Sequence, residues 1–254
     1  AFYIPILNIG GAEKVIINLL KQLSLNTGDD YFILTDAVNS SWIGEIDSKI
    51  SIININSGNN FFLRLNNLSK VIKKNSIELV VSHLTHANIH CLLIKFLGSF
   101  KLILVEHNIT STYINDIPKL KLTLKFLIST LFRKADQIIC VSQASKNDLV
   151  RVFNIPEKKC KVIYNPFDFQ RINELSNNKI PDEFSKKINN RKFIVTVSRL
   201  EIQKNHIFLI DSLSDYLKSK DIVLLLVGGG SQKNNIESKV VEYELENHVF
   251  FTNN

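Results

Sequence analysis

The sequence predicts an α/β fold of two Rossmann-like domains, each built around a doubly wound parallel sheet. Apolar strand-like runs alternate with amphipathic helix-like runs along most of the 254 residues, and this alternation is typical of that class. Several strand-like runs are apolar almost throughout, as in strands that are buried on both faces of a parallel sheet. The alternation stops once, near Asn165 and Pro166, and then resumes, which indicates a second domain.

Seven strands are predicted before this interruption and three after it. They are Phe2–Leu7, Tyr31–Thr35, Ile50–Ile55, Ile77–Ser82, Lys101–Glu106, Gln137–Val141, Lys161–Tyr164, Phe193–Ser198, Ile222–Val227 and Val249–Thr252. Runs between them predict helices, because their apolar residues recur at helical spacing or follow an N-cap residue. They include Glu13–Leu25, Phe61–Lys74, a helix from the N-cap Ser142 through Phe153, and His206–Leu217.

The predicted domains are residues 1–166 and 192–254, joined by a polar linker at 167–191. The first domain has a full set of strands, whereas only three strands follow the linker. We therefore expect the second doubly wound sheet to be incomplete. The chain has no Met, and Ala1 directly precedes a strand-like run, so a fragment or a trimmed N-terminus is also expected.

Charge and cysteine content limit the possible partners. The net charge is +7 and the isoelectric point about 9.2, which favours nucleotides, anionic lipid or nucleic acid. Nucleic acid is the weakest of these, since no zinc finger, aromatic RNA-binding signature or arginine tract is present. Cys91, Cys140 and Cys160 are widely spaced and predict neither a disulfide framework nor a zinc site. They resemble small buried apolar residues in a reducing compartment, so a cytoplasmic location is expected. No apolar run reaches the ~18 residues of a membrane span and no signal peptide is visible.

Two cations lie in a predicted loop between a strand and a helix. Arg199 and Lys204 follow the strand that ends at Ser198 and precede the helix that begins at His206. Ligands of open α/β sheets bind at such strand ends. A helix N-terminus with two cations beside it favours a phosphate or diphosphate. The alternative is that both are solvated charges on an ordinary loop.

Two glycine-rich turns also connect a strand to a helix. Gly10-Gly11 follows the first strand, and Gly228-Gly229-Gly230 follows the strand that ends at Val227. Glycine allows close approach of the backbone to a ligand, so the first turn suits phosphate and the second a base or ribose. Neither turn matches the G-x-G-x-x-G fingerprint or a P-loop, and both also fit plain tight turns.

Histidines follow the fourth and fifth predicted strands. His107 and Asn108 come directly after Glu106, and His83 and His86 follow the preceding strand. His107 could hydrogen-bond a sugar or stabilise developing charge, or it could only cap a strand. His83, His86 and Asn108 are therefore expected at the same edge of the sheet as His107. A metal is a further alternative for His83 and His86, although no third ligand is evident.

The segment 118–134 combines apolar residues with five cations. The cations are Lys119, Lys121, Lys125, Arg133 and Lys134. A helix of this composition could lie on the anionic inner leaflet of a membrane. The alternative is a helix that packs in the core while its lysines reach solvent.

Taken together, six of these motifs resemble the family-4 glycosyltransferases, which have the GT-B fold. They occur in the family's order and spacing from residue 1 to about residue 252. They are Gly10-Gly11-Ala12-Glu13, Glu106-His107-Asn108, Ala135 through Ser142, Val162 through Pro166 with Asp168, Ser198-Arg199-Leu200 with Gln203-Lys204-Asn205, and Val227-Gly228-Gly229-Gly230.

The resemblance implies retaining transfer of a sugar from a nucleotide-sugar to a glycan or lipid-linked acceptor, without a divalent metal or other cofactor, in cell-surface polysaccharide or lipopolysaccharide synthesis. It implies that Arg199 and Lys204 hold the donor diphosphate and stabilise the charge that develops on it. The Gly10-Gly11 turn would approach the same phosphates, His107 would face the transferred sugar, and Gly228 and Gly230 would lie near the nucleoside. His83, His86 and Asn108 would lie on the acceptor side.

The chain departs from the family pattern at two places. Gly229 stands where the family usually has Asp, and the family's two glutamates that bind donor sugar and ribose would fall beyond Asn254. The chain is therefore expected to be impaired in transfer, and a remnant that only binds nucleotide or acceptor is the alternative function. An epimerase or an NAD-dependent enzyme is a further alternative, although no G-x-G-x-x-G follows the first strand.

Overall fold

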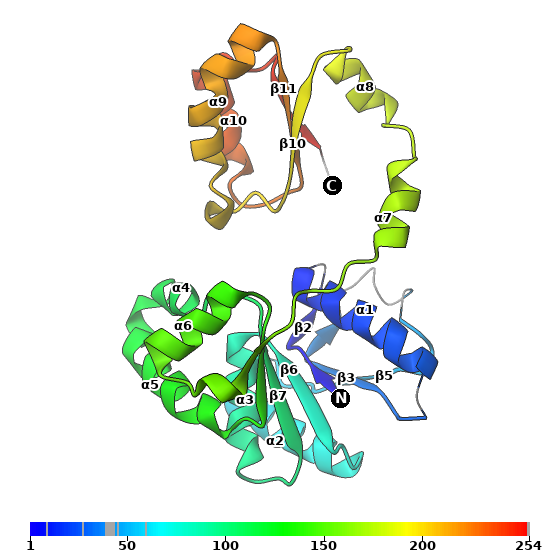
Figure 1. The fold of residues 1–254 in the computed structure, drawn as a ribbon, viewed down its shortest axis with the longest axis vertical. Coiled ribbons are helices and arrows are strands. Elements are labelled where there is room, and N and C mark those ends of the chain that lie inside the picture. The colour runs from blue at the N-terminus through cyan, green and yellow to red at the C-terminus, as the bar shows by residue number, and fades with distance from the viewer. Residues whose placement is uncertain (9, 27, 39–43, 45, 59, 253–254) are drawn as a thin grey trace. The chain divides into compact units, whose positions relative to one another are not determined.

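The protein is described by a computed structural model that covers residues 1–8, 10–26, 28–38, 44, 46–58 and 60–252. The chain divides into two compact units, Ala1–Phe169 and Gln170–Asn254, and Figure 1 labels most of their helices and many of their strands. Both units contain a parallel sheet with helices packed on it, which confirms the predicted α/β class.

The first unit is built around a seven-stranded parallel sheet. The strands lie in the order β5 (Ser51–Asn54), β3 (Phe32–Thr35), β1 (Phe2–Tyr3), β6 (Leu79–His83), β7 (Lys101–Glu106), β8 (Gln137–Cys140) and β9 (Cys160–Val162). The chain runs outward from β1 in one direction and then outward from β6 in the other, which is the Rossmann order with one strand added. Ligands of such sheets bind at the carboxyl ends of the strands where the order reverses.

The first predicted strand is divided in two, so the prediction of one strand over Phe2–Leu7 is wrong. After β1 the chain passes through Pro5 and forms β2 (Ile6–Leu7), which pairs with β4 (Ala37–Val38) in a separate sheet. Proline has no N–H to contribute to a ladder. The Pro5 carbonyl oxygen instead accepts from the Asp36 N–H at 2.8 Å.

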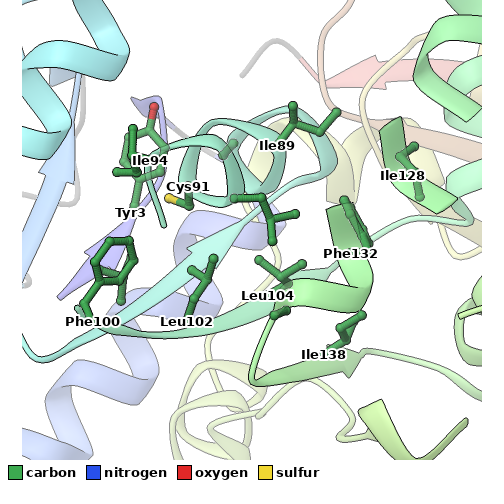
Figure 2. Packing of buried hydrophobic residues seen from close by; sticks show 14 of the residues in the cluster. Tyr3, Ile89, Cys91, Ile94, Phe100, Leu102, Leu104, Ile128, Phe132 and Ile138 are labelled. Atoms are coloured by element: carbon green, nitrogen blue, oxygen red, sulfur yellow. The ribbon is translucent and has the colours of Figure 1, made fainter. Parts of the chain in front are cut away.

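Helices cover both faces of the larger sheet. They are α1 (Gly11–Asn26) on one face, and α2 (Phe61–Lys74), α3 (Thr85–Lys95), α4 (Thr110–Asn115), α5 (Lys121–Leu131) and α6 (Gln143–Phe153) on the other. Figure 2 shows part of the second interface, in which Leu102 and Leu104 of β7 are buried with Phe132. Cys91, Cys140 and Cys160 are buried and free, in line with their expected role as small apolar residues.

The second unit has a three-stranded parallel sheet. The strands are β10 (Phe193–Val197), β11 (Val223–Val227) and β12 (Val249–Thr252), in that order. Helices α9 (His206–Lys220) and α10 (Lys233–Glu242) pack together with one face of this sheet around Leu224 and Leu226.

The segment 167–191, which was predicted to be a linker, contains two helices. They are α7 (Phe169–Ser176) and α8 (Asp182–Ile188). Phe184 and Ile188 of α8 lie four residues apart and pack on Val223 and Leu225 of the sheet. These two apolar side chains attach α8 to the sheet of the second unit, whereas no residue of α7 is buried.

Candidate functional site

Arg199 and Lys204 lie where the prediction placed them, between the end of β10 and the start of α9. Both side chains are exposed, and neither forms an ion pair with any residue that the structure describes. Asn205 begins α9 in the left-handed conformation (φ 51°, ψ 42°) and makes no side-chain capping bond. The loop therefore presents two cations beside a helix end with free N–H groups, which suits an anion.

The segment from Arg199 to Lys204, here called the cationic loop, is hydrogen-bonded to the glycine turn Gly228-Gly229-Gly230 and the residues that follow it after β11. The Leu200 N–H donates to the Gly229 carbonyl at 2.8 Å, and the Gln232 N–H donates to the Leu200 carbonyl at 2.9 Å. Ser231 donates to the Glu201 carboxylate from its N–H at 3.1 Å and from its hydroxyl at 2.8 Å. These hydrogen bonds lower the pKa of Glu201. The geometry of the loop is thus set by its neighbour before any ligand binds.

Gly228 and Gly230 are required by this contact between the two turns. Their φ angles are 131° and 159°, in the region that L side chains rarely adopt. A Cβ on Gly228 would overlap the Ser198 carbonyl, and one on Gly230 would lie 2.6 Å from the Leu200 carbonyl carbon. Packing of one turn on the other accounts for both glycines, and their proximity to a nucleoside stays a prediction.

The Gly10-Gly11 turn directly precedes the N-terminus of α1. The helix begins at Gly11, and the Lys14 N–H donates to the Gly10 carbonyl at 3.1 Å. A Cβ on Gly10 would meet the Glu13 carboxylate, whereas one on Gly11 would meet nothing within 4 Å. The space beside Gly11 fits close approach of a ligand, although Ile9 of the same turn lies outside the described residues.

His83 and His107 are brought together at the carboxyl edge of the first unit's sheet. Nδ1 of His83 and Nε2 of His107 are 2.9 Å apart. Burial holds the pKa of His83 well below its usual range and lowers the pKa of His107 to about 4, so both rings are neutral near pH 7.

The other two predicted acceptor-side residues do not join this pair. His86 lies near Arg64, and burial followed by that cation lowers its pKa. The Asn108 carbonyl accepts from the Ser145 hydroxyl at 3.1 Å, while the Asn108 side chain is exposed. Within the described ranges, no group of three or more His, Cys, Asp or Glu side chains is placed to hold a metal ion.

Glu106 is a buried carboxyl whose interactions were not predicted. Its Oε2 accepts from the hydroxyls of Thr85 at 2.7 Å and Thr110 at 3.1 Å, and its Oε1 accepts from the Asn88 amide at 2.7 Å. Thr85 and Thr110 are the first residues of α3 and α4. Glu106 therefore holds the starts of two helices against the end of β7, one residue before His107.

Replacing Glu106 by Gln is expected to change how the stability depends on pH. Burial raises the pKa of Glu106 from 4.5 to about 7, so the folded state holds this proton more tightly than the unfolded chain does. The stabilisation is then full below pH 4.5 and is lost as the pH rises through about 7. Urea unfolding from pH 4 to pH 8 (roughly the window set by the two pKa values) should show that the free energy of unfolding declines less in Glu106→Gln than in the unchanged protein.

The exposed Glu78→Gln is the matched control, because its carboxyl lies on the surface near the start of β6. The free energy of unfolding of Glu78→Gln should decline with rising pH as that of the unchanged protein does. A Glu106→Gln variant with the full decline of the unchanged protein would show that Glu106 does not titrate in this range.

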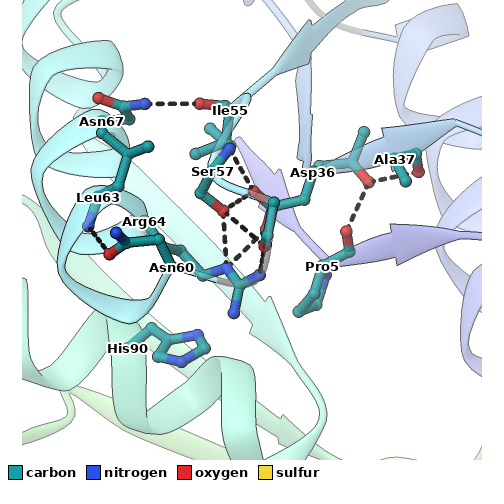
Figure 3. A network of polar contacts seen from close by, with 12 residues as sticks. Pro5, Asp36, Ala37, Ile55, Ser57, Asn60, Leu63, Arg64, Asn67 and His90 are labelled. Atoms are coloured by element: carbon teal, nitrogen blue, oxygen red, sulfur yellow. Dashed lines mark hydrogen bonds and ion pairs between the residues drawn. The ribbon is translucent and has the colours of Figure 1, made fainter.

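A second polar network, at the end of β3, was also missed (Figure 3). Arg64 Nε donates to Asp36 at 2.8 Å and to the Ser57 hydroxyl at 3.0 Å, and Ser57 also donates to Asp36. The Arg64 and Asp36 side chains are only 17% and 7% exposed. Such a buried and paired cation holds the start of α2 beside β3 and is neutralised within the fold.

Two family models match the chain. The model described as "Glycosyltransferase Family 4" matches residues 9–171, and the one described as "Glycosyl transferases group 1" matches residues 178–254.

No helix in the described parts of the chain is both long and apolar enough to cross a membrane.

Named relatives and solved structures agree with these matches. The chain is 31% identical to the N-acetylgalactosamine-N,N'-diacetylbacillosaminyl-diphospho-undecaprenol 4-alpha-N-acetylgalactosaminyltransferase of Campylobacter jejuni, over 99% of the chain and 69% of that protein. It is 26% identical to the amylovoran biosynthesis glycosyltransferase AmsD of Erwinia amylovora, over 94% of the chain and 64% of that protein. The fold is similar to that of Anabaena HepE in complex with UDP and glucose, with a TM-score of 0.75, 20% identity and coverage of 98% of the chain and 67% of HepE.

The chain thus spans roughly two thirds of the length of these proteins. The first family model covers well over half of the chain, and the Campylobacter relative is similar along nearly all of it. These matches, together with the sheet order and the paired turns, show that the chain belongs to glycosyltransferase family 4.

Proposed function

We propose that the protein transfers a sugar from a nucleotide-sugar donor to a glycan or lipid-linked acceptor, with retention at the anomeric carbon. The observation that carries this proposal is the cationic loop of Arg199 and Lys204, held rigidly at the N-terminus of α9 in a family-4 chain. The name of the Campylobacter relative includes a diphospho-undecaprenol acceptor, and Anabaena HepE is in complex with UDP. The first supports a lipid-linked acceptor and the second a nucleotide-sugar donor. The name of the Erwinia relative, an amylovoran biosynthesis glycosyltransferase, supports a role in surface polysaccharide or lipopolysaccharide synthesis.

The proposed chemistry breaks the bond between the anomeric carbon and the donor diphosphate. Negative charge then develops on the departing diphosphate, and fixed cations stabilise it more in the transition state than in the ground state. Arg199, Lys204 and the free N–H groups of α9 would supply this stabilisation without a divalent metal. The acceptor hydroxyl attacks from the face that the diphosphate leaves and passes its proton to the diphosphate, so no protein nucleophile is needed.

A transfer assay tests this function directly. UDP-, GDP- and ADP-sugars would each be offered with a polyprenyl-diphosphate-linked sugar as the acceptor, and NMR would give the anomeric configuration of the product. Transfer with the donor's configuration is expected from one of the three nucleotides. Calorimetry that shows tight binding of a nucleotide without any transfer would instead support the binding remnant.

We also propose that α5 rests on the cytoplasmic, anionic leaflet of a membrane. Ile128 of α5 and Phe132, the residue directly after α5, are fully buried, whereas Leu122 and Phe126 of α5 are 81% and 68% exposed. Exposed lysines, including Lys121 and Lys125 of the same helix, accompany the apolar side chains. One face therefore packs in the core while the other combines apolar and cationic groups, as surface-bound helices do.

The membrane proposal predicts that Leu122→Asn with Phe126→Asn weakens binding to anionic vesicles more than about tenfold, since two apolar side chains no longer enter the interface. Lys125→Gln is expected to weaken it about fivefold. Sedimentation with vesicles of phosphatidylglycerol and phosphatidylcholine measures both effects. Val241→Asn, at a position that is 60% exposed on α10, is the control. Equal binding by all variants would contradict the proposal.

A further inference from the structure

His83 and His107 share one hydrogen bond, and the direction of that bond determines what His107 offers a ligand. His83 ends β6 and lies opposite Val105 of β7, so His107 follows two residues further along the neighbouring strand. Nδ1 of His83 lies 2.9 Å from Nε2 of His107, and the two ring planes differ by 25°. Only one proton can lie between these two nitrogens.

Both rings are neutral near pH 7, because burial lowers the pKa of each. A neutral imidazole has one N–H and one lone pair. Two arrangements are therefore possible. In the first, His107 donates from Nε2 and keeps a lone pair on Nδ1. In the second, His83 donates from Nδ1, and His107 carries its proton on Nδ1.

The burial of His83 favours the second arrangement. Its ring is 0% exposed, and its Nε2 has no hydrogen-bond partner among the residues that the structure describes. The Phe2 ring, whose centroid lies 6.0 Å from that of His83, offers no conventional acceptor. In the first arrangement the His83 proton would occupy Nε2 as an unpaired buried N–H, a group that proteins avoid more strictly than an unpaired acceptor.

We propose that His83 donates from Nδ1 to Nε2 of His107 and thereby holds the proton of His107 on Nδ1, as a hydrogen-bond donor to an oxygen of the bound sugar. His83 is then a positioning residue that acts through His107. Only the identity of the receiving oxygen rests on the proposed function. Which nitrogen of His107 carries the proton depends only on the contact between His83 and His107, not on the bound sugar.

The backbone on both sides of the pair is fixed. Leu84, directly after His83, has φ 80° and ψ 140°, a conformation that residues with a side chain rarely adopt. The Leu84 N–H donates to the Val105 carbonyl at 3.2 Å, and Thr85 donates to Glu106 at 2.7 Å. Strain of this kind persists where the surrounding structure holds it, so the two rings have little freedom to separate.

This arrangement limits the chemistry that His107 can perform. With a proton on Nδ1, the ring can donate to a sugar hydroxyl or ring oxygen. It cannot take a proton from the acceptor hydroxyl through the same nitrogen, because that nitrogen has no lone pair. His107 is therefore an electrostatic and orienting group rather than a general base.

Nitrogen-15 NMR of the whole chain tests the proposal without any substrate. The chain has six histidines, and the His107 signals are assigned by their loss in His107→Asn. Two-bond correlations at pH 7.5, roughly one unit above the ordinary histidine pKa, should show the proton of His107 on Nδ1. A proton on Nε2 of His107 in the unchanged protein would overturn the proposal, whether or not the chain transfers sugar.

Variants of His83 add a functional measurement. His83→Phe removes the donor to Nε2, so the proton of His107 is no longer held on Nδ1 by a hydrogen bond and both neutral forms of the ring should be populated, and kcat should fall about tenfold with a nearly unchanged KM for the donor. His83→Asn keeps an N–H donor near the position of Nδ1 and should restore most of kcat. His248→Asn, at a histidine of the second unit that contacts the Ile222 carbonyl, should leave kcat unchanged. An unaltered kcat in His83→Phe would overturn the positioning role.

Discussion

Replacing Arg199 by Ala is expected to lower kcat/KM for sugar transfer by roughly 30- to 1000-fold, which corresponds to ~2–4 kcal/mol of lost transition-state stabilisation. Arg199 is exposed on a loop whose main chain is held by Gly229 and Gln232. The substitution should therefore remove the cation without moving the loop. Initial-rate kinetics with the nucleotide-sugar found by the transfer assay would measure the effect.

Lys204→Ala is expected to lower kcat/KM by a similar factor, because Lys204 ends the 3-10 turn Ile202–Lys204 next to the N-terminus of α9. Measuring the binding of free nucleotides distinguishes a specific contact with the diphosphate from a general effect of the substitution on the protein. Both variants should bind the nucleoside diphosphate more weakly while binding of the nucleoside itself stays unchanged. Lys220→Ala removes an exposed cation from the opposite end of α9 and should change neither value. Unchanged kcat/KM in both loop variants would refute the diphosphate role.

Gly228→Ala and Gly230→Ala are each expected to destabilise the second unit by about 3 kcal/mol, through backbone strain together with overpacking. At both positions the added Cβ would press on main-chain atoms, the Ser198 carbonyl or Leu200, which cannot rotate away as a side chain can. The cost should appear as a lower urea midpoint and, because the same contact shapes the cationic loop, as weaker nucleotide binding.

Gly28→Ala is the matched control for these two substitutions. Gly28 is exposed, and a Cβ there would meet nothing within 4 Å, so its stability should stay within about 0.5 kcal/mol of the unchanged protein. If Gly228→Ala and Gly230→Ala unfold at the same urea concentration as Gly28→Ala, the two turns do not pack together as described.

Elements that depend on local signals could be predicted from the sequence. The bounds of α2 and β7 were predicted to the residue, because an amphipathic period and an uninterrupted apolar run are visible without tertiary context. Ser142 caps α6 as expected, since its side chain accepts from the Ser145 N–H three residues later. The positions of Arg199 and Lys204 at a strand end followed from the same alternation.

The contacts that shape the site could not be predicted, because they join residues far apart in the chain. Glu106 meets Thr85 and Asn88 across 21 and 18 residues, and Glu201 meets Ser231 across 30. Such pairs depend on which strands become neighbours and in which register, which one sequence does not specify. Both carboxylates nonetheless lie within or beside strand-end motifs that the sequence analysis identified. The motifs therefore predicted where the site lies but not the hydrogen bonds that hold it together.

The main-chain hydrogen bonds between the cationic loop and the glycine turn do not depend on which side chain stands at position 229. Gly229 contributes its main-chain carbonyl oxygen to Leu200, a group that every amino acid carries. The positive φ angles of this turn are those of Gly228 and Gly230. An Asp in its place, as in much of the family, would keep the same tie. Substitution of this side chain therefore leaves the main-chain contact between the two turns in place, and with it the position of the loop that carries Arg199 and Lys204.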